Sequence, residues 1–487
     1  MIALQQIRSL IVALCFACLA LASWASSDTP LTDYVGIYAD AAGERLEIVV
    51  GKDLFAVIDE AKYPLTRAGG DHFVARSGDR VLFTRAANGV VDGVAAQGKR
   101  HERIALQPSK AASDLAWPRP ENPGAASTYR YTAPPDLGDG IRSGAAVAPG
   151  LGSAVLEQLV QGVLDGHWAD VHGLLIHQHG RLVLEEYFYG YGPTRPHQMR
   201  SATKSVVSAL AGIASTRPSA TPLGATVATR LPYGAYANPD ARKQAITLEN
   251  LLTMRSGLAC DDWDPNSPGN ESRLYESPDW VKATLDLPMA EAPGQRARYC
   301  SGAVAVVGRL TEIAVGSALP EFAQAALFGP LGIQRQDWRW NYQLTNQNRE
   351  YSQIHLRPRD LLKLGLLYAN GGRWENRQVI PAAWVQASLA AQSELGGNGY
   401  GYFWWRRALE VETPSGKRRV EFSAAQGNGG QRIILLPEYG LVMVFTGGDY
   451  NSGNAPPNRI LSSLILPALL AGTPAAPTTP TGPVPPR

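Results

Sequence analysis

The sequence has few cysteines, few methionines and no excess of either charge. Of its 487 residues four are Cys and five are Met, and 45 Lys and Arg against 43 Asp and Glu leave a net charge of +2. No block of like charges stands out, so the chain has no electrostatic footprint for nucleic acid and we expect no such partner. With 45% apolar and 18% charged residues, the composition is that of an ordinary globular protein with two or three domains.

Long apolar runs are also missing, apart from one near the N-terminus. Residues 10–22 (LIVALCFACLALA) follow Arg8 and precede Ser23-Trp24-Ala25, a small-x-small cleavage pattern. This arrangement predicts a secretory signal peptide over residues 1–25. The run is too short for a permanent bilayer span, and no second run is long enough. We therefore expect no membrane span after signal removal and a periplasmic or secreted mature protein.

Two of the four cysteines, Cys15 and Cys18, fall inside the signal peptide. The mature chain then holds only Cys260 and Cys300. Exported proteins with two cysteines usually pair them, although two separate buried thiols are the alternative. We predict a disulfide between Cys260 and Cys300.

The order of patterns along the chain predicts two folded parts. Residues 27–106 hold short alternating runs separated by turn residues, which is typical of a small all-β barrel or sandwich. Residues 107–150 are rich in Pro, Ala and Gly and are interpreted as a linker. Residues 151–471 place strand patterns at both ends and helical patterns between them, an α+β domain whose sheet is closed by distant segments. The patterns predict a helix that Ser153 would cap, a helix over residues 301–315, and strands over residues 400–406 and 431–436. Residues 472–487, rich in Pro and Thr, are predicted to be a disordered tail.

One short motif carries the best candidate chemistry. Ser201-Ala202-Thr203-Lys204 is the only Ser-x-x-Lys in the sequence, and it opens an apolar helical pattern. On a helix, Lys204 lies one turn from Ser201 on the same face, so its amine can reach the hydroxyl. The helix N-terminus also favours negative charge on an attacking oxygen. Most serines at this position only cap a helix, and the motif alone leaves that alternative open.

Two other groups of polar residues could suggest a metal. His177 and His179 point to one face of a predicted strand, but no third ligand has suitable spacing. The acidic loop Asp261–Asn266 lacks the glycine and the closing glutamate of a calcium loop, and we interpret it as a hydrogen-bonded turn. The sequence predicts no metal site and no cofactor.

Further motifs follow in order along the chain. They are residues 251–258 (LLTMRSGL), Tyr299-Cys300-Ser301, residues 361–374 (LLKLGLLYANGGRW) and residues 426–431 (QGNGGQ). Together with the Ser201 motif, and over about residues 130–470, they resemble the serine β-lactamase-like hydrolases. This family includes class C β-lactamases, penicillin-binding peptidases, carboxylesterases and 6-aminohexanoate-dimer hydrolase. The resemblance implies a β-lactamase-like α+β domain, an antiparallel sheet flanked by helices plus a helical region.

The resemblance also implies roles for four residues. Ser201 would be the nucleophile, and Lys204 would hold or accept its proton. Tyr299 matches the tyrosine of the family's Tyr-x-Asn motif and would act as general base. The amides of Ser201 and Gln431 would form the oxyanion hole.

The chain departs from the family pattern at two positions. Ser301 replaces the Asn of Tyr-x-Asn, which the esterase and amidase branches tolerate. Asn428, followed by Gly429 and Gly430 in the expected substrate-binding segment, stands where lactamases carry a Lys and esterases carry a His. Without that cation the site lacks a grip for a substrate carboxylate, which argues against penicillins and D-Ala-D-Ala ends.

These observations predict a serine hydrolase acting on a small ester, amide or peptide through an acyl-enzyme on Ser201. The alternative is a catalytically weak or inactive relative that binds cell-wall fragments. Nothing in the sequence specifies an oligomeric state.

Overall fold

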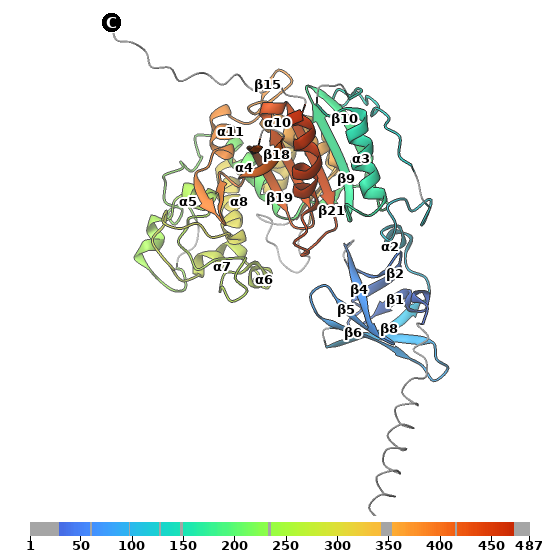
Figure 1. The fold of residues 1–487 in the computed structure, drawn as a ribbon. Coiled ribbons are helices and arrows are strands. Elements are labelled where there is room, and N and C mark those ends of the chain that lie inside the picture. Colours follow the sequence, from blue (N-terminus) through green and yellow to red (C-terminus); the bar gives the residue numbers. More distant parts are fainter. Residues whose placement is uncertain are drawn as a thin grey trace, which may run out of the picture. The chain divides into compact units, whose positions relative to one another are not determined.

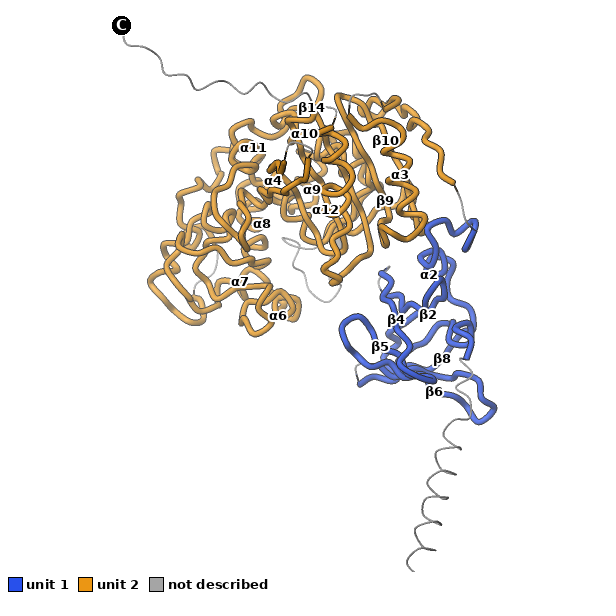
Figure 2. Tube along the Cα trace, viewed as in Figure 1, with its two compact units in different colours: residues 1–125 blue, residues 126–487 orange. Residues whose placement is uncertain are grey.

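The computed structural model describes residues 29–58, 61–96, 98–125, 128–146, 150–231, 235–341, 353–413 and 416–471. The chain divides into two compact units, residues 1–125 and residues 126–487 (Figure 2). The predicted signal peptide and the predicted tail at 472–487 lie outside the described residues.

The first unit is a closed eight-stranded barrel, so the barrel alternative applies rather than the sandwich. Each strand pairs antiparallel with the next, and β8 pairs with β1. Tyr34, Tyr38, Phe73 and Phe83 fill the interior with ring centroids 4.7 to 6.0 Å apart. Closure leaves no free strand edge. The strands are β1 Gly36–Ala39, β2 Arg45–Val50, β3 Leu54–Ile58, β4 Ala61–Gly69, β5 His72–Ala75, β6 Arg80–Arg85, β7 Val91–Ala96 and β8 Lys99–Ala105.

The first part of the predicted linker packs on this barrel. Helix α2, Lys110–Asp114, is capped by Ser109. The Ser109 amide and hydroxyl donate to the two carboxylate oxygens of Glu47 on β2, at 2.5 and 3.0 Å. A short helix anchored by a charge-assisted cap therefore belongs to the barrel unit.

The second unit is built on an antiparallel sheet with the strand order β10-β9-β21-β20-β19-β18-β17-β16. Every residue of β9 is buried, and β9 pairs with β21 from the far end of the chain. The sheet is thus closed by distant segments. The strands are β9 Val171–Gln178, β10 Arg181–Tyr187, β16 Ser393–Leu395, β17 Asn398–Tyr400, β18 Trp405–Thr413, β19 Gly416–Gly427, β20 Gln431–Leu436 and β21 Leu441–Gly447.

One predicted strand, residues 400–406, is wrong. The structure ends β17 at Tyr400 and begins β18 at Trp405, with a tight loop between them. Phe403 has a positive φ of 60°. A Cβ on Gly401 would lie 2.0 Å from the Ser388 carbonyl oxygen. The backbone therefore turns here, which lets the intervening aromatic side chains enter the core.

The helices divide between the two sides of the sheet (Figure 1). Helices α4, α8 and α10 share one hydrophobic core with β20 and β21. Helix α3 packs with the C-terminal helices instead. Ser153, the predicted cap of α3, is its first helical residue, and Gly152 is the N-cap. The main helices are α3 Ser153–Leu164, α4 Thr203–Ala214, α5 Leu248–Leu252, α6 Glu271–Tyr275, α7 Trp280–Asp286, α8 Ser301–Val315, α9 Leu319–Ala323, α10 Pro358–Ala369, α11 Ala382–Leu389, α12 Pro456–Ile460 and α13 Leu466–Ala471.

Helix α4 is buried on almost every side, since only Ile213 of its twelve residues is not buried. Such a helix belongs to the centre of a domain. Shorter elements complete the unit: β11 His197–Gln198, β12 Arg339–Asn341, β13 Gln353–Leu356, β14 Arg373–Trp374, β15 Arg377–Gln378 and the helical turns η2 Arg200–Ala202, η3 Ala241–Ala245, η4 Gln324–Phe328 and η8 Leu461–Ile465.

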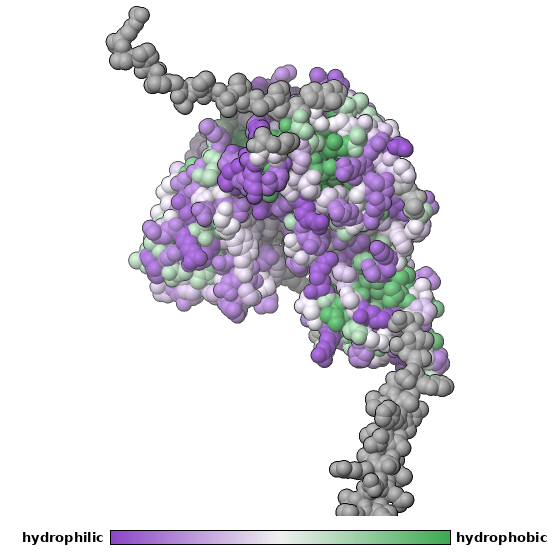
Figure 3. All heavy atoms as spheres, in the orientation of Figure 1, coloured by the Kyte–Doolittle hydropathy of each residue, from purple (hydrophilic) through white to green (hydrophobic). Residues whose placement is uncertain are grey.

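The surface mixes polar and apolar side chains, and Figure 3 shows apolar patches on both units. Among the described residues, no single helix has both the length and the apolar character to cross a bilayer. One bent pair, Ser301–Val315 with Leu319–Leu331, meets those two criteria jointly, with a 72° bend.

Candidate active site

Ser201 lies in a single helical turn, η2, that leads directly into α4. The preceding residue, Arg200, has a φ of +48°, a conformation that is costly for a side chain with a Cβ and is often found at functional sites. The turn is tethered because the Met199 amide donates to the Ile354 carbonyl at 2.9 Å. The helix predicted to start at or just after Ser201 is confirmed, because α4 begins at Thr203, two residues after the serine.

Lys204 joins two hydroxyl groups. Its Nζ lies 3.0 Å from Ser201 Oγ and 3.0 Å from Ser301 Oγ, and the side chain is 1% exposed. A buried ammonium group is costly unless it is paired. The geometry therefore holds the Lys204 amine against the Ser201 hydroxyl, as the Ser-x-x-Lys spacing predicted.

The counter-charge comes from a residue that the sequence analysis missed. Asp262 Oδ2 accepts hydrogen bonds from the Ser301 hydroxyl at 2.7 Å and from the Ser301 amide at 2.8 Å. Glu271 Oε2 lies 3.2 Å from the same hydroxyl. Burial raises the pKa of Asp262 to about 6, against the opposing effect of Lys204. Lys204, Ser301 and Asp262 thus form a continuous polar chain that ends at Ser201.

The acidic loop is partly the predicted turn. Asp261 Oδ1 accepts from the Trp263 amide at 3.0 Å, and Asp264 Oδ1 accepts from the Asn266 amide at 2.9 Å. These two carboxylates make local turns of the usual kind. Asp262, between them, makes no such turn in the structure and reaches helix α8 instead. The loop has three aspartates and its turns use only two of them, so the third aspartate was the signal available in the sequence.

Tyr299 and the disulfide complete this part of the site. The Tyr299 ring centroid lies 4.8 Å from Lys204 Nζ. The predicted disulfide between Cys260 and Cys300 is confirmed, with a Cα–Cα distance of 5.3 Å. The Asp262 amide also donates to the Tyr299 carbonyl at 2.8 Å. The bond therefore joins the segment that carries the tyrosine to the segment that carries the buried carboxylate.

Aromatic side chains line the space beside Tyr299. Its ring stacks against Trp263 at 5.4 Å and Trp405 at 5.8 Å between centroids. Trp263 is 54% exposed, whereas Tyr299 is 8% exposed. An exposed indole on a nearly buried tyrosine offers apolar contact area to a bound molecule.

The β19–β20 hairpin approaches the turn that carries Ser201 through Gly427. A Cβ on Gly427 would lie 2.2 Å from the Met199 carbonyl oxygen. The side chains of the other predicted residues point elsewhere. The Gln431 side chain bonds both backbone groups of Gly447. The Asn428 side chain donates to Asn451 Oδ1 at 2.7 Å. Gly429 and Gly430 form the tip, with φ of 86° and 93°.

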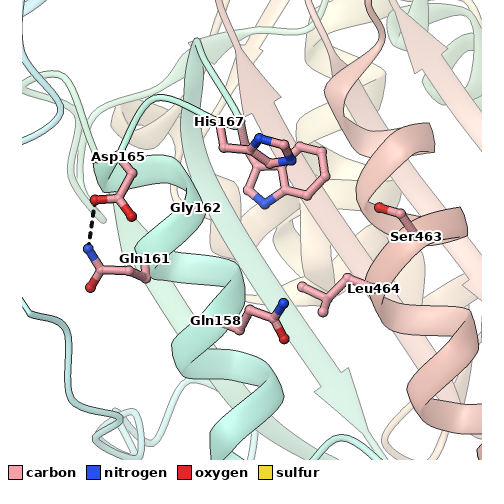
Figure 4. Close-up of a pocket in the computed structure, with 8 residues that line it drawn as sticks. Gln158, Gln161, Gly162, Asp165, His167, Ser463 and Leu464 are labelled. Carbon is pink, nitrogen blue, oxygen red and sulfur yellow. Dashed lines mark hydrogen bonds between the residues drawn. The ribbon is translucent and has the colours of Figure 1, made fainter.

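A pocket lies away from Ser201, Tyr299 and the β19–β20 hairpin. It has a volume of about 470 Å³ and lies between α3 and η8 (Figure 4). Its Ser463 hydroxyl donates to the Arg459 carbonyl at 2.7 Å. The proton of this serine is therefore engaged by a backbone oxygen and not by a basic side chain. The lining residues are Gln158, Gln161, Gly162, Asp165, His167, Trp168, Ser463 and Leu464. We place the candidate active site at Ser201.

Residues 156–460, more than half of the chain, match the model of the family described as Beta-lactamase. The chain belongs to the β-lactamase family. The resemblance drawn from the ordered motifs is therefore confirmed, and with it the assignment to a family of hydrolases.

Individual relatives of this β-lactamase-family chain are distant. Lovastatin esterase from Penicillium rubens is 31% identical over 139 residues, which are 28% of this chain and 33% of the esterase. The chain thus matches about a third of that curated relative's length. A β-lactamase structure from Bacteroides dorei is 18% identical, covers 64% of this chain and 98% of its own, and has a TM-score of 0.49. A 6-aminohexanoate-dimer hydrolase structure from Bacillus anthracis is 16% identical, covers 60% and 78%, and has a TM-score of 0.48.

Proposed function

We propose that this β-lactamase-family protein is an exported serine hydrolase that cleaves small esters or amides through an acyl-enzyme on Ser201. The observation that carries the proposal is Lys204 Nζ, 3.0 Å from the Ser201 hydroxyl and anchored on its other side by Ser301. A serine that only capped a helix would not need a buried lysine fixed against its hydroxyl.

The first half of the proposed reaction forms the acyl-enzyme. Ser201 Oγ attacks the carbonyl carbon while its proton passes to the phenolate oxygen of Tyr299. The carbonyl electron pair moves onto oxygen and gives a tetrahedral oxyanion. When the intermediate collapses, the bond to the leaving alcohol or amine breaks, and that group takes the proton from Tyr299. Lys204 favours the negative charge that the tyrosine and serine oxygens carry in turn.

The second half releases the acid. A water molecule gives a proton to the same base and attacks the acyl carbon. Collapse of the second tetrahedral intermediate breaks the bond to Ser201 Oγ and returns a proton to it. Atoms balance as one ester or amide plus one water giving one acid and one alcohol or amine.

The oxyanion hole is proposed at the amides of Ser201 and Gln431. The support is positional, because the hairpin that carries Gln431 contacts the nucleophile turn at Gly427. Backbone amides fixed by a strand end and a helix start cost little reorganisation as charge develops.

Two further observations support the proposed substrate class and location. The curated relative is an esterase by name, which favours esters among the two substrate types. A disulfide is typical of oxidising compartments, and this fits the predicted signal peptide. Both points remain part of the proposal.

A fluorophosphonate probe tests it directly. We expect labelling of Ser201, and we expect Ser201→Ala to lose both labelling and hydrolysis of p-nitrophenyl esters. Ser215→Ala is the matched control, since that hydroxyl donates to the Gly212 carbonyl at 2.7 Å at the far end of α4, and it should keep both. Labelling that survives in Ser201→Ala would refute the proposal. Absence of turnover over a broad panel of esters, amides and β-lactams would favour a binding protein.

A further inference from the structure

Two arginines lie next to the candidate active site and are not used by the proposed reaction. Arg407 is on β18 and Arg432 is on β20, and we call them the arginine pair. The family's lysine is replaced by Asn428 in this region, so the sequence motif itself supplies no cation here. Arg432 supplies a positive charge from four residues further along the same hairpin.

Strand register places the arginine pair on the same face of the sheet as Trp405. Arg432 pairs with Gln426 across β19 and β20, and Arg407 Nη1 donates to Gln426 Oε1 at 2.9 Å. Trp405 is two residues before Arg407 on β18, so the two side chains share a face. Trp405 stacks on Tyr299 at 5.8 Å. The arginine pair therefore lies on the same sheet face as the tryptophan that contacts Tyr299.

The positive charges of the arginine pair are not neutralised. Within the described ranges, no carboxylate forms an ion pair with either residue. Arg432 Nη1 donates to the Gly427 and Gln431 carbonyls at 2.9 and 2.8 Å. The Arg432 Nε atom is buried and has no hydrogen-bond partner among the described residues. The neighbouring Arg406, in contrast, pairs with Glu421 at 2.8 Å.

Two adjacent guanidinium groups with no counter-ion are costly to bury. Burial, followed by repulsion from Arg407, lowers the pKa of Arg432 to about 10. Burial lowers the pKa of Arg407 as well. Both groups stay protonated at neutral pH, so an anion placed between them would be strongly favoured.

A structural role for the arginine pair explains only part of the arrangement. Arg432 Nη1 fastens the hairpin by binding two carbonyl oxygens. That role leaves its Nε donor unused and gives no reason for a second cation, Arg407, beside it. An anionic ligand accounts for both.

We propose that Arg407 and Arg432 form a subsite for a carboxylate on the substrate of Ser201. The inference rests on the proposed hydrolase function and specifies its substrate class: esters or amides that carry a carboxylate in the acyl part or in the leaving group. The cation that the family pattern places at Asn428 is thus replaced, in this chain, by guanidinium groups from two strands.

Matched esters test the subsite. Mono-p-nitrophenyl glutarate and p-nitrophenyl butyrate differ by a carboxylate in the acyl part. The butyrate esters of 4-hydroxybenzoate and of its methyl ester differ by a carboxylate in the leaving group. For each pair the readout is the ratio of kcat/KM for the anionic ester to kcat/KM for the neutral one. We expect Arg407→Gln to lower one of the two ratios roughly tenfold or more, mainly through KM.

Three further variants keep the result interpretable. Arg406→Gln is the matched control, because its guanidinium pairs with Glu421, and both of its ratios should stay at the wild-type value. Arg407→Lys should restore part of the lost ratio because it keeps the charge without the fork. Arg432→Gln should act like Arg407→Gln, and if its melting curve shows that it does not fold, the Arg407 variants decide.

Ratios that are unchanged in Arg407→Gln for both ester pairs, in an enzyme that turns over the neutral esters, would overturn the subsite alone. Absence of turnover of all four esters, together with absence of Ser201 labelling, would instead refute the proposed function. The pair whose ratio falls shows which side of the scissile bond the carboxylate occupies.

Discussion

Removing the negative charge of Asp262 should damage catalysis while leaving the fold intact. The substitution Asp262→Asn keeps the size of the side chain and an oxygen that can accept from Ser301. It removes the carboxylate charge that lies 2.7 Å from the Ser301 hydroxyl and is linked through that hydroxyl to Lys204. We expect a lower kcat/KM with normal folding.

The size of the effect follows from the geometry. The two hydrogen bonds through Ser301 are 3.0 and 2.7 Å long, so the Lys204 and Asp262 charges are at most about 6 Å apart. At an effective dielectric constant of about 20, charges at that distance interact with about 3 kcal/mol. About 3 kcal/mol in a barrier is roughly a hundredfold in rate. Because the asparagine dipole retains part of this interaction, we expect kcat/KM to fall between about tenfold and a hundredfold.

The thermal stability of Asp262→Asn, unlike its kcat/KM, should not fall below that of the wild type. Burial raises the pKa of Asp262 to about 6, above the value of about 4 for an unfolded aspartate. The contribution of this group to stability is therefore fully present below about pH 4 and is lost as the pH rises through about 6. At pH 8 the variant no longer carries a buried charge. Its Tm should equal or exceed that of the wild type, as expected where a site trades stability for function.

Kinetics across pH and thermal melts at pH 8 provide the assay. In the wild type we expect kcat/KM to fall as the pH drops through about 6, because Asp262 becomes neutral there. The variant should lack this acidic limb. Asp261→Asn, which alters a half-buried carboxylate that forms a local turn, should behave as the wild type. Wild-type kcat/KM and an intact acidic limb in Asp262→Asn would refute the reasoning.

Two further outcomes are expected. Reducing the Cys260–Cys300 bond, which closes a separation of 40 residues, removes about 3 to 4 kcal/mol in the chain-entropy estimate; ester turnover should fall before circular dichroism shows unfolding, and parallel loss of both signals would contradict a positional role. Gly427→Ala would place a Cβ 2.2 Å from the Met199 carbonyl oxygen and should lower kcat by up to about a hundredfold, whereas Gly152→Ala, with open space around it, should match the wild type in the same assay.

Local sequence patterns were sufficient for much of the fold. The helix at Ser301–Val315 and the strand at Gln431–Leu436 have the predicted bounds, because their apolar periodicity agrees with their burial. The strand expected over residues 400–406 failed because its aromatic and apolar residues are buried in a loop. Apolar residues report burial, and burial alone does not separate a strand from a tight turn in the core.

The candidate site was predictable only where its residues are close in sequence or belong to a known motif. The contact between Lys204 and Ser201 follows from helical spacing. The contact between Asp262 and Ser301 spans 39 residues and depends on how two loops are joined, which no local pattern encodes. Arg432 was passed over because β periodicity treats it as an ordinary strand residue, although it is polar between buried neighbours.

The pairing of β9 with β21 also affects how the protein is made. Strand β9 forms its hairpin with β10 early in synthesis, but its other edge waits for a partner about 260 residues further on. At typical rates of synthesis this interval lasts roughly 13 to 50 s. Throughout that time an apolar strand has one unpaired edge, the feature that most readily recruits another chain. A ribosome that stalls anywhere between the two strands therefore leaves an aggregation-prone fragment. The central sheet can be completed only after β21 has left the ribosome and paired with β9.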